Sequence, residues 1–379
     1  MKSKIFDIST MPNFRKILIL CLLAGSLFAV HAESPTQEFT RTINREFGTT
    51  TDGMTALYNK YGQVNVKTWQ NKSVKIDITI IVNAKNQREA DKTFDRIKVN
   101  FANTAGYVKA ETVIEQISGV TWFNGGENDF KINYEVFMPV ANQLDLKNRY
   151  GNSYVAPLAG KLTAEIKYGD LRTEAISNDA DLNLGYGKGY IARVNNLYGQ
   201  ISYGELTVTE AREVQLDTKY SELKGDRINI MRLTSKYDDF ELGDVDELRL
   251  QTKYANLRVR SARAAYVTAQ YTDVRLVSVT ETADADLSYG SLKIESIGRD
   301  FSGVNVVGKY TDVQLFAERG AAYRFNLEGN YTDIKTSPGA AVRHHNKSGK
   351  YEKVEGSVGD SNAKGLVKAK LNYGGLVLK

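Results

Sequence analysis

The chain has 379 residues, of which 42% are hydrophobic and 10% aromatic, with 50 Lys and Arg against 45 Asp and Glu. This is the composition of an ordered protein and excludes a disordered or collagen-like chain. Only five prolines, with 31 glycines and 22 tyrosines, favour β structure with many turns over a helical bundle.

The first 32 residues have the features of a cleaved export signal. Arg15 and Lys16 precede an apolar run over residues 17–30, which ends at the small-residue site Val30-His31-Ala32. The run is shorter than the roughly 20 residues that span a bilayer, so a membrane anchor is the weaker alternative. A second start at Met11, in place of Met1, would give a more compact signal.

Cleavage after Ala32 changes both the charge and the thiol content of the chain. It removes four basic residues and one acidic residue, which leaves a net charge of +2 instead of +5. A nearly neutral chain gives no electrostatic basis for nucleic-acid binding. The one cysteine, Cys21, leaves with the signal, so disulfides, thiolate metal sites and cysteine nucleophiles are excluded from the mature chain.

Residues 33–140 predict a small α+β region that covers the N-terminal end of the protein. Alternating strands are expected at 40–43 and 74–80, then a helix over 87–96 capped by Asn86, then strands near 107–114 and 130–137. Tyr61-Gly62-Gln63-Val64 already has the form of the later repeat. The repeat array would then begin at Tyr61 and be interrupted by an inserted strand-helix-strand segment.

Residues 141–379 carry an internal repeat marked by tyrosine, here called the tyrosine series. Its members recur about every 17 to 18 residues at first and about every 20 to 22 residues near the end, the range of a solenoid repeat. An apolar residue usually follows three positions after the tyrosine. The series is Tyr150, Tyr168, Tyr186, Tyr203, Tyr220, Tyr237, Tyr254, Tyr271, Tyr289, Tyr310, Tyr331, Tyr351 and Tyr373.

The pattern around each tyrosine predicts a mainly β fold, a single-stranded parallel β-solenoid of about 13 coils. Period-two alternation runs into each tyrosine, as in Leu250-x-Thr252-x-Tyr254, and resumes out of phase with Leu257-x-Val259, which marks a corner between two strands. We expect a right-handed β-helix, the general preference for parallel crossovers. Because the tyrosines share parity with apolar residues such as Leu250, we expect their rings to face inward as a structural ladder.

Two other repeat architectures compete with the solenoid. A propeller needs about 40 residues for each blade, roughly twice the length of the period found here. A meander barrel would place two equivalent turns in each period, whereas only one corner here is strongly specified.

The chain resembles the bacterial putative-adhesin domain family of exported β-solenoid proteins. The resemblance rests on the start Asn59-Lys60-Tyr61-Gly62, the Asn83-Ala84-Lys85 helix entry and the serial Tyr-Gly-Asp-Leu units such as Tyr168-Gly169-Asp170-Leu171, and it extends over nearly the whole mature chain. It implies a location in the envelope or on the cell surface and a binding role. It supplies no catalytic or ligand residues.

The shortest interval of the tyrosine series, which separates Tyr203 from Tyr220, predicts which charged side chains become neighbours in space. It places Glu241 between Lys224 and Arg258, Asp244 beside Arg227, and Asp246 beside Arg263. Opposite charges would therefore alternate along the stack, as expected of a neutralised solvent-facing surface.

Three groups of polar residues are candidate sites of chemistry, and each has a simpler interpretation. The acid-rich stretch 238–247 is either a calcium or carboxylate site or a solvated face, and the alternating charges favour the face. Corner acids such as Asp170 and Asp312 are more typical of structural corners than of metal ligands. His344 and His345 lie in a polar segment expected to be a solvated loop.

The sequence therefore predicts no catalytic residues, no metal ligands and no cofactor. We expect a non-enzymatic exported protein of the periplasm, cell surface or extracellular space that presents its ladder surface to a glycan, an envelope component or another protein. A carbohydrate-active β-helix enzyme is the alternative, because a cluster on neighbouring coils is invisible in the linear sequence. A structural envelope factor without a ligand is the third possibility.

Overall fold

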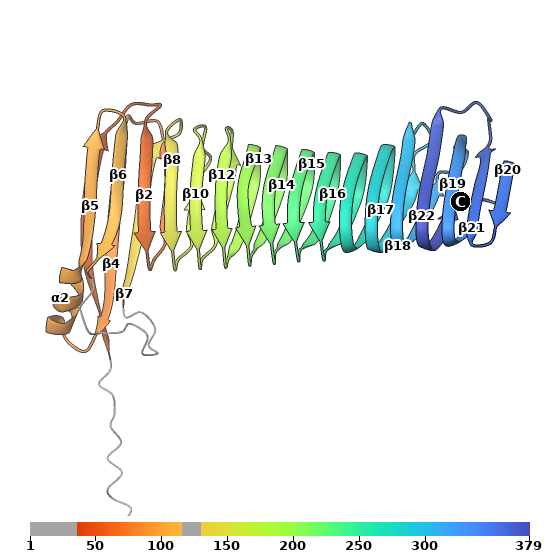
Figure 1. Cartoon of the computed structure of the whole chain (residues 1–379). Coiled ribbons are helices and arrows are strands. Elements are labelled where there is room, and N and C mark those ends of the chain that lie inside the picture. Colours follow the sequence, from red (N-terminus) through yellow and green to blue (C-terminus); the bar gives the residue numbers. More distant parts are fainter. Residues whose placement is uncertain (1–35, 116–129) are drawn as a thin grey trace, which may run out of the picture.

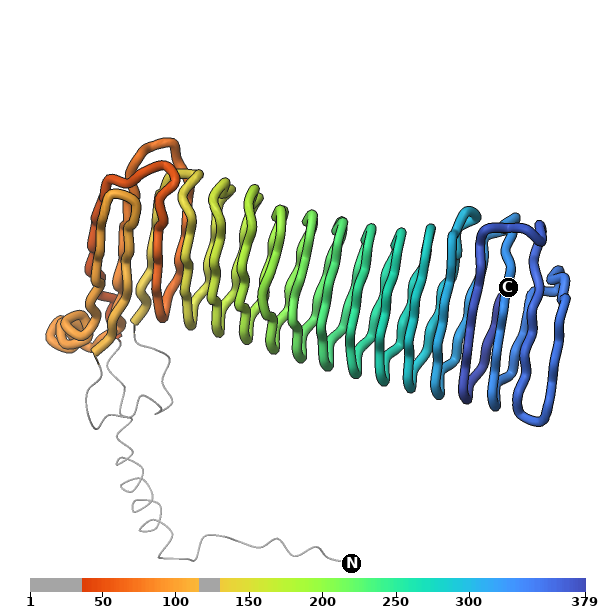
Figure 2. Tube along the Cα trace, turned by 45° about the horizontal axis from the view of Figure 1, so that its top comes forward, coloured from red at the N-terminus to blue at the C-terminus, as the bar shows by residue number. Residues whose placement is uncertain are grey.

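The computed structural model describes residues 36–115 and 130–379, which form one long rod of stacked coils (Figure 1). The predicted export signal lies outside these residues. The trace in Figure 2 shows the chain winding in successive loops of similar size from the N-terminal region to the far end. The predicted parallel β-solenoid is therefore confirmed, and its handedness stays a prediction.

The N-terminal end of the rod is closed by antiparallel pairings that differ from the parallel pairings of the coils. Strand β1 pairs antiparallel with β4, β4 with β7, and β5 with β6. Strands β2 and β3 instead pair in parallel with β8 and β9 of the next coil. The elements of this region are β1 (Gln37–Gly48), β2 (Met54–Lys60), β3 (Val64–Trp69), β4 (Ser73–Ala84), α2 (Gln87–Arg96), β5 (Ile97–Thr104), β6 (Tyr107–Ile114) and β7 (Phe130–Pro139).

The helix α2 is found at the predicted residues and with the predicted cap. The Asn86 side chain accepts a hydrogen bond of 3.1 Å from the backbone N–H of Glu89, which satisfies one of the free donors at the helix start. Ala90 and Phe94 are buried against the core. The helix therefore packs one apolar stripe onto the end of the rod and exposes the rest.

Each coil contributes one strand before its tyrosine and one after it, and these build two facing parallel sheets. Strand β10 pairs in parallel with β8 and β12, and β11 pairs with β9 and β13. From β13 to β17 the strand that follows one tyrosine runs on, as one bent strand, into the strand that precedes the next, and β17 continues through the corners at Tyr271 and Tyr289. The elements are β8 (Gln143–Arg149), β9 (Ser153–Val155), β10 (Leu162–Lys167), β11 (Leu171–Ile176), β12 (Ala180–Gly185), β13 (Lys188–Ser202), β14 (Glu205–Lys219), β15 (Glu222–Lys236), β16 (Asp239–Lys253), β17 (Asn256–Ile297) and β18 (Gly303–Ala317).

The core lies between the two sheets and repeats from coil to coil. In β14, Leu206 and Val208 face inward from one sheet and Val214 and Leu216 from the other, and all four are almost completely buried. Parallel in-register pairing places each of them over its counterpart in the next coil, as Leu216 lies over Leu233. One continuous apolar core therefore runs along the rod, as expected of a solenoid.

The C-terminal end departs from the order expected of consecutive coils. Strand β22 pairs in parallel with both β18 and β19, so it lies between them, and β19 continues into the antiparallel strands β21 and β20. These strands are β19 (Tyr323–Lys335), β20 (Ala341–Ser348), β21 (Tyr351–Val358) and β22 (Gly365–Leu378). The prediction that Tyr351 marks a coil corner is wrong, because Tyr351 opens a hairpin strand that pairs antiparallel with β19.

Candidate functional site

The tyrosines lie on the outside of the rod, so the prediction of inward-facing rings is wrong. Tyr150 to Tyr373, without Tyr351, are 37% to 51% exposed. Each has a φ between 51° and 63°, in the left-handed region that non-glycine residues seldom adopt. This conformation breaks the alternation of the strand at the tyrosine itself, and the ring turns out of the core at the corner.

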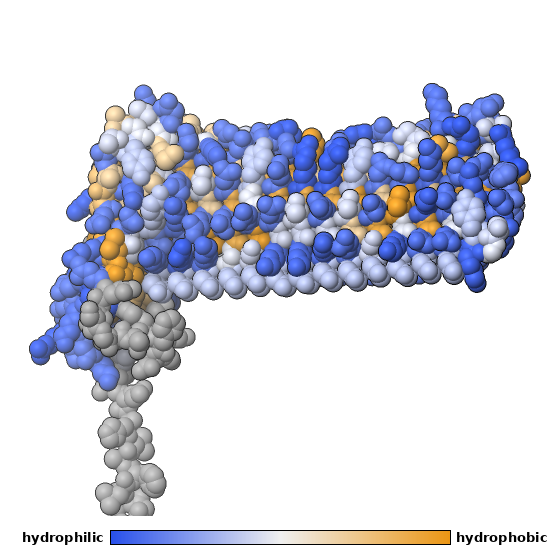
Figure 3. Space-filling view, viewed as in Figure 1, coloured by the Kyte–Doolittle hydropathy of each residue, from blue (hydrophilic) through white to orange (hydrophobic). Residues whose placement is uncertain are grey.

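The exposed rings form a regular column, here called the tyrosine ladder, along the lower edge of the rod (Figure 3). Neighbouring rings are stacked with centroids 4.7 to 5.0 Å apart and planes within 15° of parallel. The ladder begins at Tyr61, which stacks on Tyr150, and Tyr373 lies between Tyr310 and Tyr331. Its order is Tyr61, Tyr150, Tyr168, Tyr186, Tyr203, Tyr220, Tyr237, Tyr254, Tyr271, Tyr289, Tyr310, Tyr373 and Tyr331.

The stacking determines what the ladder offers to a ligand. Each inner ring has a tyrosine on both of its faces, as Tyr237 has Tyr220 at 4.7 Å and Tyr254 at 4.9 Å. No sugar ring or nucleobase fits between rings at this separation. The ladder therefore presents ring edges and hydroxyl groups, and it stabilises the rod rather than providing a stacking platform.

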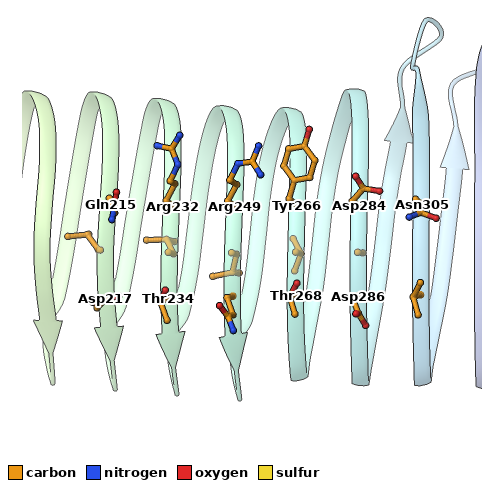
Figure 4. Close-up of a pocket in the computed structure, with 17 residues that line it drawn as sticks. Gln215, Asp217, Arg232, Thr234, Arg249, Tyr266, Thr268, Asp284, Asp286 and Asn305 are labelled. Atoms are coloured by element: carbon orange, nitrogen blue, oxygen red, sulfur yellow. The ribbon is translucent and has the colours of Figure 1, made fainter.

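A shallow groove, here called the central groove, runs along the face that precedes the tyrosine corner. Two adjoining hollows of about 780 Å³ and 680 Å³ share Asp217, Thr234, Gln251 and Thr268, which occupy equivalent positions in successive coils. Arg232, Arg249 and Tyr266 form a second row beside this one (Figure 4). The third row, next to the ladder, contains Lys219, Lys236, Lys253 and Gln270.

The arginines of the groove are held in place by neighbouring side chains. Arg249 donates a hydrogen bond of 2.7 Å to Glu247 and lies 4.4 Å from the centre of the Tyr266 ring. Arg232 pairs with Glu213. The groove therefore has one wall of compensated arginines, a central row of small polar side chains, and a wall of lysines for which no ion pair within 4.0 Å is found in the described residues.

The predicted charge stack is in register, but its ion pairs are not formed. Lys224 lies opposite Glu241, and Glu241 opposite Arg258, on successive strands. The Lys224 ammonium contacts Glu222 at 2.8 Å and Glu205 at 3.2 Å instead. These contacts raise the pKa of Lys224 above its ordinary value. Among the described residues Glu241 has no ion pair within 4.0 Å.

Of the other two predicted neighbour pairs, one forms an ion pair and one does not. Arg263 binds Asp246 at 2.7 Å across one coil, as expected, and also approaches Glu281 at 2.5 Å on the other side. Asp244 lies opposite Arg227 in register but pairs with Arg260 at 2.7 Å. That pairing lowers the pKa of the Asp244 carboxyl. Three acids of the acid-rich stretch, Asp244, Asp246 and Glu247, thus form ion pairs on a solvated face.

Asp238 is the exception in that stretch, because only 3% of its surface is exposed. Its carboxylate accepts hydrogen bonds from the Thr218 hydroxyl at 2.8 Å and from the backbone N–H groups of Ser221 at 2.7 Å and Lys236 at 3.0 Å. Burial nevertheless raises its pKa above the ordinary value of an aspartate. The sequence pattern did not distinguish this buried acid from its exposed neighbours.

The corner acids and the histidines have structural partners. Asp170 accepts a hydrogen bond of 2.9 Å from the backbone N–H of Lys188, and Asp312 one of 2.8 Å from that of Gly375. His344 and His345 are exposed, as predicted, but the predicted loop is wrong, since both lie in β20, where His345 contacts Glu352 at 2.9 Å. Within residues 36–115 and 130–379, no cluster of three or more His, Cys, Asp or Glu is placed to hold a metal ion.

Comparisons with known proteins give structural matches only. Neither the models of protein families nor the curated proteins give a match. The structural matches include a putative adhesin from Parabacteroides distasonis, with 11% identity over 74% of this chain and 98% of that chain and a TM-score of 0.28. A putative lipid binding protein from the same species matches with 14% identity over 72% of this chain and 92% of that chain, at a TM-score of 0.25.

A third match is a putative cell adhesion protein from Clostridium sporogenes, with 8% identity over 91% of this chain and 99% of that chain and a TM-score of 0.19. At these identities and scores no residue's role passes to this chain. In the described part of the chain, no helix has the length and apolar character needed to cross a membrane.

Proposed function

We propose that the chain is an exported, non-enzymatic binding protein of the adhesin type that holds an extended glycan in the central groove. The observation that supports this most directly is the repetition of hydrogen-bonding side chains across successive coils. Asp217, Thr234, Gln251 and Thr268 present an equivalent polar group once in every coil, open to solvent. A polymer with a repeating unit matches such a surface better than a compact small molecule does.

The arrangement of carboxylates in the groove favours binding over catalysis. Glycoside hydrolysis needs two carboxyl groups about 5 to 9.5 Å apart on either side of the scissile bond. Asp217 is four coils from Asp284 and Asp286, which corresponds to about 19 Å at roughly 4.8 Å for each coil. Asp284 and Asp286 lie on one strand, and they are the only groove pair that the alternative of a carbohydrate-active enzyme could use.

The proposal is tested by a binding and turnover screen on the mature chain that begins at Glu33. Immobilised protein is presented with neutral and acidic polysaccharides and with envelope fractions, and the soluble products are analysed for shortened chains. We expect retention of at least one polysaccharide without shortening. Retention of a protein from the envelope fraction alone would contradict the glycan assignment, and products that disappear in Asp286→Asn would contradict the non-enzymatic one.

A matched pair of substitutions locates the binding surface. Gln251→Trp fills the centre of the groove, whereas Gln314→Trp makes the same change at an exposed residue beyond the tyrosine corner, on the other sheet. Retention should be lost in the first variant and kept in the second, with equal thermal stability. Equal retention by both variants would contradict the groove as the binding surface.

Export is the remaining part of the proposal, and its support is the apolar run at residues 17–30 with its small-residue site. Intact mass of the protein recovered from an envelope fraction measures it. A chain that begins at Glu33 agrees with a periplasmic, surface or extracellular protein. A retained leader, or a diacyl mass on Cys21, would contradict cleavage at this site.

A further inference from the structure

We infer that Lys219, Lys236 and Lys253 form a binding strip for a linear polysaccharide that carries a carboxylate on each sugar. This inference rests on the function proposed for the central groove and names the chemical class of its ligand. The three lysines are called the lysine strip. They form the wall of the groove that adjoins the tyrosine ladder.

The lysine strip concentrates positive charge. Lys219 lies opposite Lys236, and Lys236 opposite Lys253, on successive parallel strands. The adjacent tyrosine rings fix the separation of the coils at 4.7 and 4.9 Å. All three side chains are exposed, and within the described residues none has an ion pair within 4.0 Å. Like charges directly opposite on neighbouring strands destabilise a sheet.

The tyrosine ladder orients the strip without neutralising it. Two of the ammonium groups, those of Lys219 and Lys236, lie 5.4 and 5.0 Å from the centres of the adjacent tyrosine rings. Such a contact attracts the cation to the ring but leaves its full charge in place. The strip therefore keeps its positive charge available to an anion in the groove.

In the two coils marked by Tyr150 and Tyr168, the cations of the same row are compensated. Arg149 and Lys167 occupy the positions before Tyr150 and Tyr168, and both bind Glu165, at 3.1 and 3.0 Å. Glu165 stands two positions before Lys167, so this position is acidic in that coil. In the groove this position holds Thr234 before Lys236 and Gln251 before Lys253, which are neutral. Asp217 precedes Lys219 in the same way but forms no ion pair with it within 4.0 Å, as far as the described chain extends.

Lysines beyond the tyrosine corner, on the other sheet, are compensated as well. Lys224 pairs with Glu222 at 2.8 Å, Lys293 with Glu295 at 3.0 Å, and Lys335 with Asp333 at 2.8 Å. The rod thus balances these lysines on that sheet and leaves the lysine strip unbalanced along the groove. Single cations elsewhere in the described residues, such as Lys309, also lack an ion pair within 4.0 Å, but the lysine strip places three of them opposite one another on consecutive coils.

The geometry of the strip indicates the class of anion. Three ammonium groups at intervals of one coil match anions that recur at a short, constant spacing, as carboxylates do along an extended acidic polysaccharide. Each ammonium donates up to three hydrogen bonds. Thr234, Gln251 and Gln270 lie beside the strip and supply neutral donors and acceptors for the sugar hydroxyls.

A single-stranded nucleic acid fits the same surface less well. Proteins that bind such strands without sequence preference combine cations with aromatic faces on which the bases stack. Here Tyr220, Tyr237 and Tyr254 stack on one another, with planes 3° and 9° apart, so no base fits between them. The surface offers cations and hydrogen bonds but no platform on which successive bases could stack, which favours the polysaccharide.

The test compares two probes that share one backbone. Polygalacturonate carries a carboxylate on each sugar, and its fully methyl-esterified form carries none. We expect the wild-type mature chain to bind polygalacturonate at least about tenfold more tightly than the ester, with an affinity that falls as salt is added. Equal affinities, or tighter binding of single-stranded poly(dT), would overturn the inference.

Two triple variants assign the effect to the strip. Replacing Lys219, Lys236 and Lys253 by Gln should weaken polygalacturonate binding about tenfold or more, since it removes all three cations that the inference places against the carboxylates. Replacing Lys224, Lys293 and Lys335 by Gln changes the net charge by the same amount on the other sheet and should weaken binding less than about twofold. Equal losses in the two variants would show that net charge alone is responsible, which overturns the inference.

Two further measurements, the thermal stability of the lysine variant and the binding of a neutral polysaccharide by Gln251→Trp, separate failure of the inference from failure of the proposed function. Removing the lysine strip relieves repulsion, so its variant should melt no lower than the wild type at low salt, and unfolding cannot account for lost binding. One outcome is that the wild type retains a neutral polysaccharide that Gln251→Trp does not retain, and yet fails to bind polygalacturonate. That result overturns the inference and leaves the proposed function in place. If no polysaccharide binds at all, both fail.

Discussion

The Thr218 hydroxyl donates a hydrogen bond of 2.8 Å to the carboxylate of Asp238, which lies in the next coil and is 3% exposed. The interaction joins two coils directly behind the exposed tyrosine ladder. It also leaves a titratable group inside the rod, at a position that Ser221 occupies one coil earlier.

Asp238 should make the stability of the rod depend on pH. Burial raises its folded-state pKa, so the folded chain binds this proton more tightly than the unfolded chain does. Its stabilising contribution is complete below the unfolded pKa of about 3.9 and is lost as pH rises through the folded pKa. The difference in unfolding free energy between wild type and Asp238→Ser, from urea titrations between about pH 4 and pH 7, should therefore decrease with pH. An increase would mean that the three hydrogen bonds lower this pKa.

The tyrosine ladder should contribute more stability at its centre than at its end. Tyr254 stacks on two rings and Tyr331 on one. Both have nearly the same φ, so the backbone strain of an alanine in the left-handed conformation is similar at the two positions. Tyr254→Ala should cost about 1 kcal/mol more than Tyr331→Ala, the value of one aromatic pair. Chemical unfolding of the two variants measures this. Equal losses would show that the stacking carries no energy.

The sequence predicts which tyrosines form the ladder, but it does not predict that their rings point outward. The near-constant recurrence of tyrosine is enough to place Tyr150 to Tyr289 on successive coils, because parallel in-register strands repeat with the chain. The inward direction was inferred from parity with residues such as Leu250. Parity holds only along an extended strand, and the left-handed φ of each tyrosine ends it.

The order of the tyrosines at the C-terminal end of the ladder could not be predicted from the sequence either, for a different reason. Spacing identifies which residues resemble corners but not the order in which strands pair. Tyr373 lies between Tyr310 and Tyr331 because β22 returns past the hairpin of β20 and β21, and Tyr351 begins a strand of that hairpin. The lengthening of the tyrosine intervals after Tyr289 was the only sign of this change.

The insertion of β22 gives a sharp test through Gly374. This glycine has φ +142°, and a Cβ there would lie 2.1 Å from the carbonyl oxygen of Thr311 in β18. Gly374→Ala should cost at least about 2 kcal/mol, whereas Gly339→Ala, where a Cβ meets nothing within 4 Å, should change stability little. Unfolding free energies of the two variants are compared. A tolerated Gly374→Ala would contradict the position of β22 beside β18.

The charge register is tested by two double-mutant cycles on pairs that are each one coil apart. Asp246 and Arg263 are 2.7 Å apart, whereas Glu241 and Arg258 are in register without an ion pair within 4.0 Å in the described structure. Neutralising Asp246 and Arg263 to Asn and Gln should reveal a coupling of about 0.2 to 1 kcal/mol that shrinks in high salt. Neutralising Glu241 and Arg258 to Gln should reveal a smaller coupling. The reverse ranking would contradict the side-chain arrangement described here.

A glycan that lies along the rod across several coils should bind more tightly as it becomes longer. We would therefore measure the affinity of the mature chain for size-graded fragments of the polysaccharide that the binding screen retains, from the disaccharide upward. Affinity should rise with each added sugar until the groove from Asp217 to Asp286 is filled, a span of about 19 Å, and then stay constant. If the disaccharide already binds with full affinity, the ligand occupies a single compact pocket and does not extend along the rod.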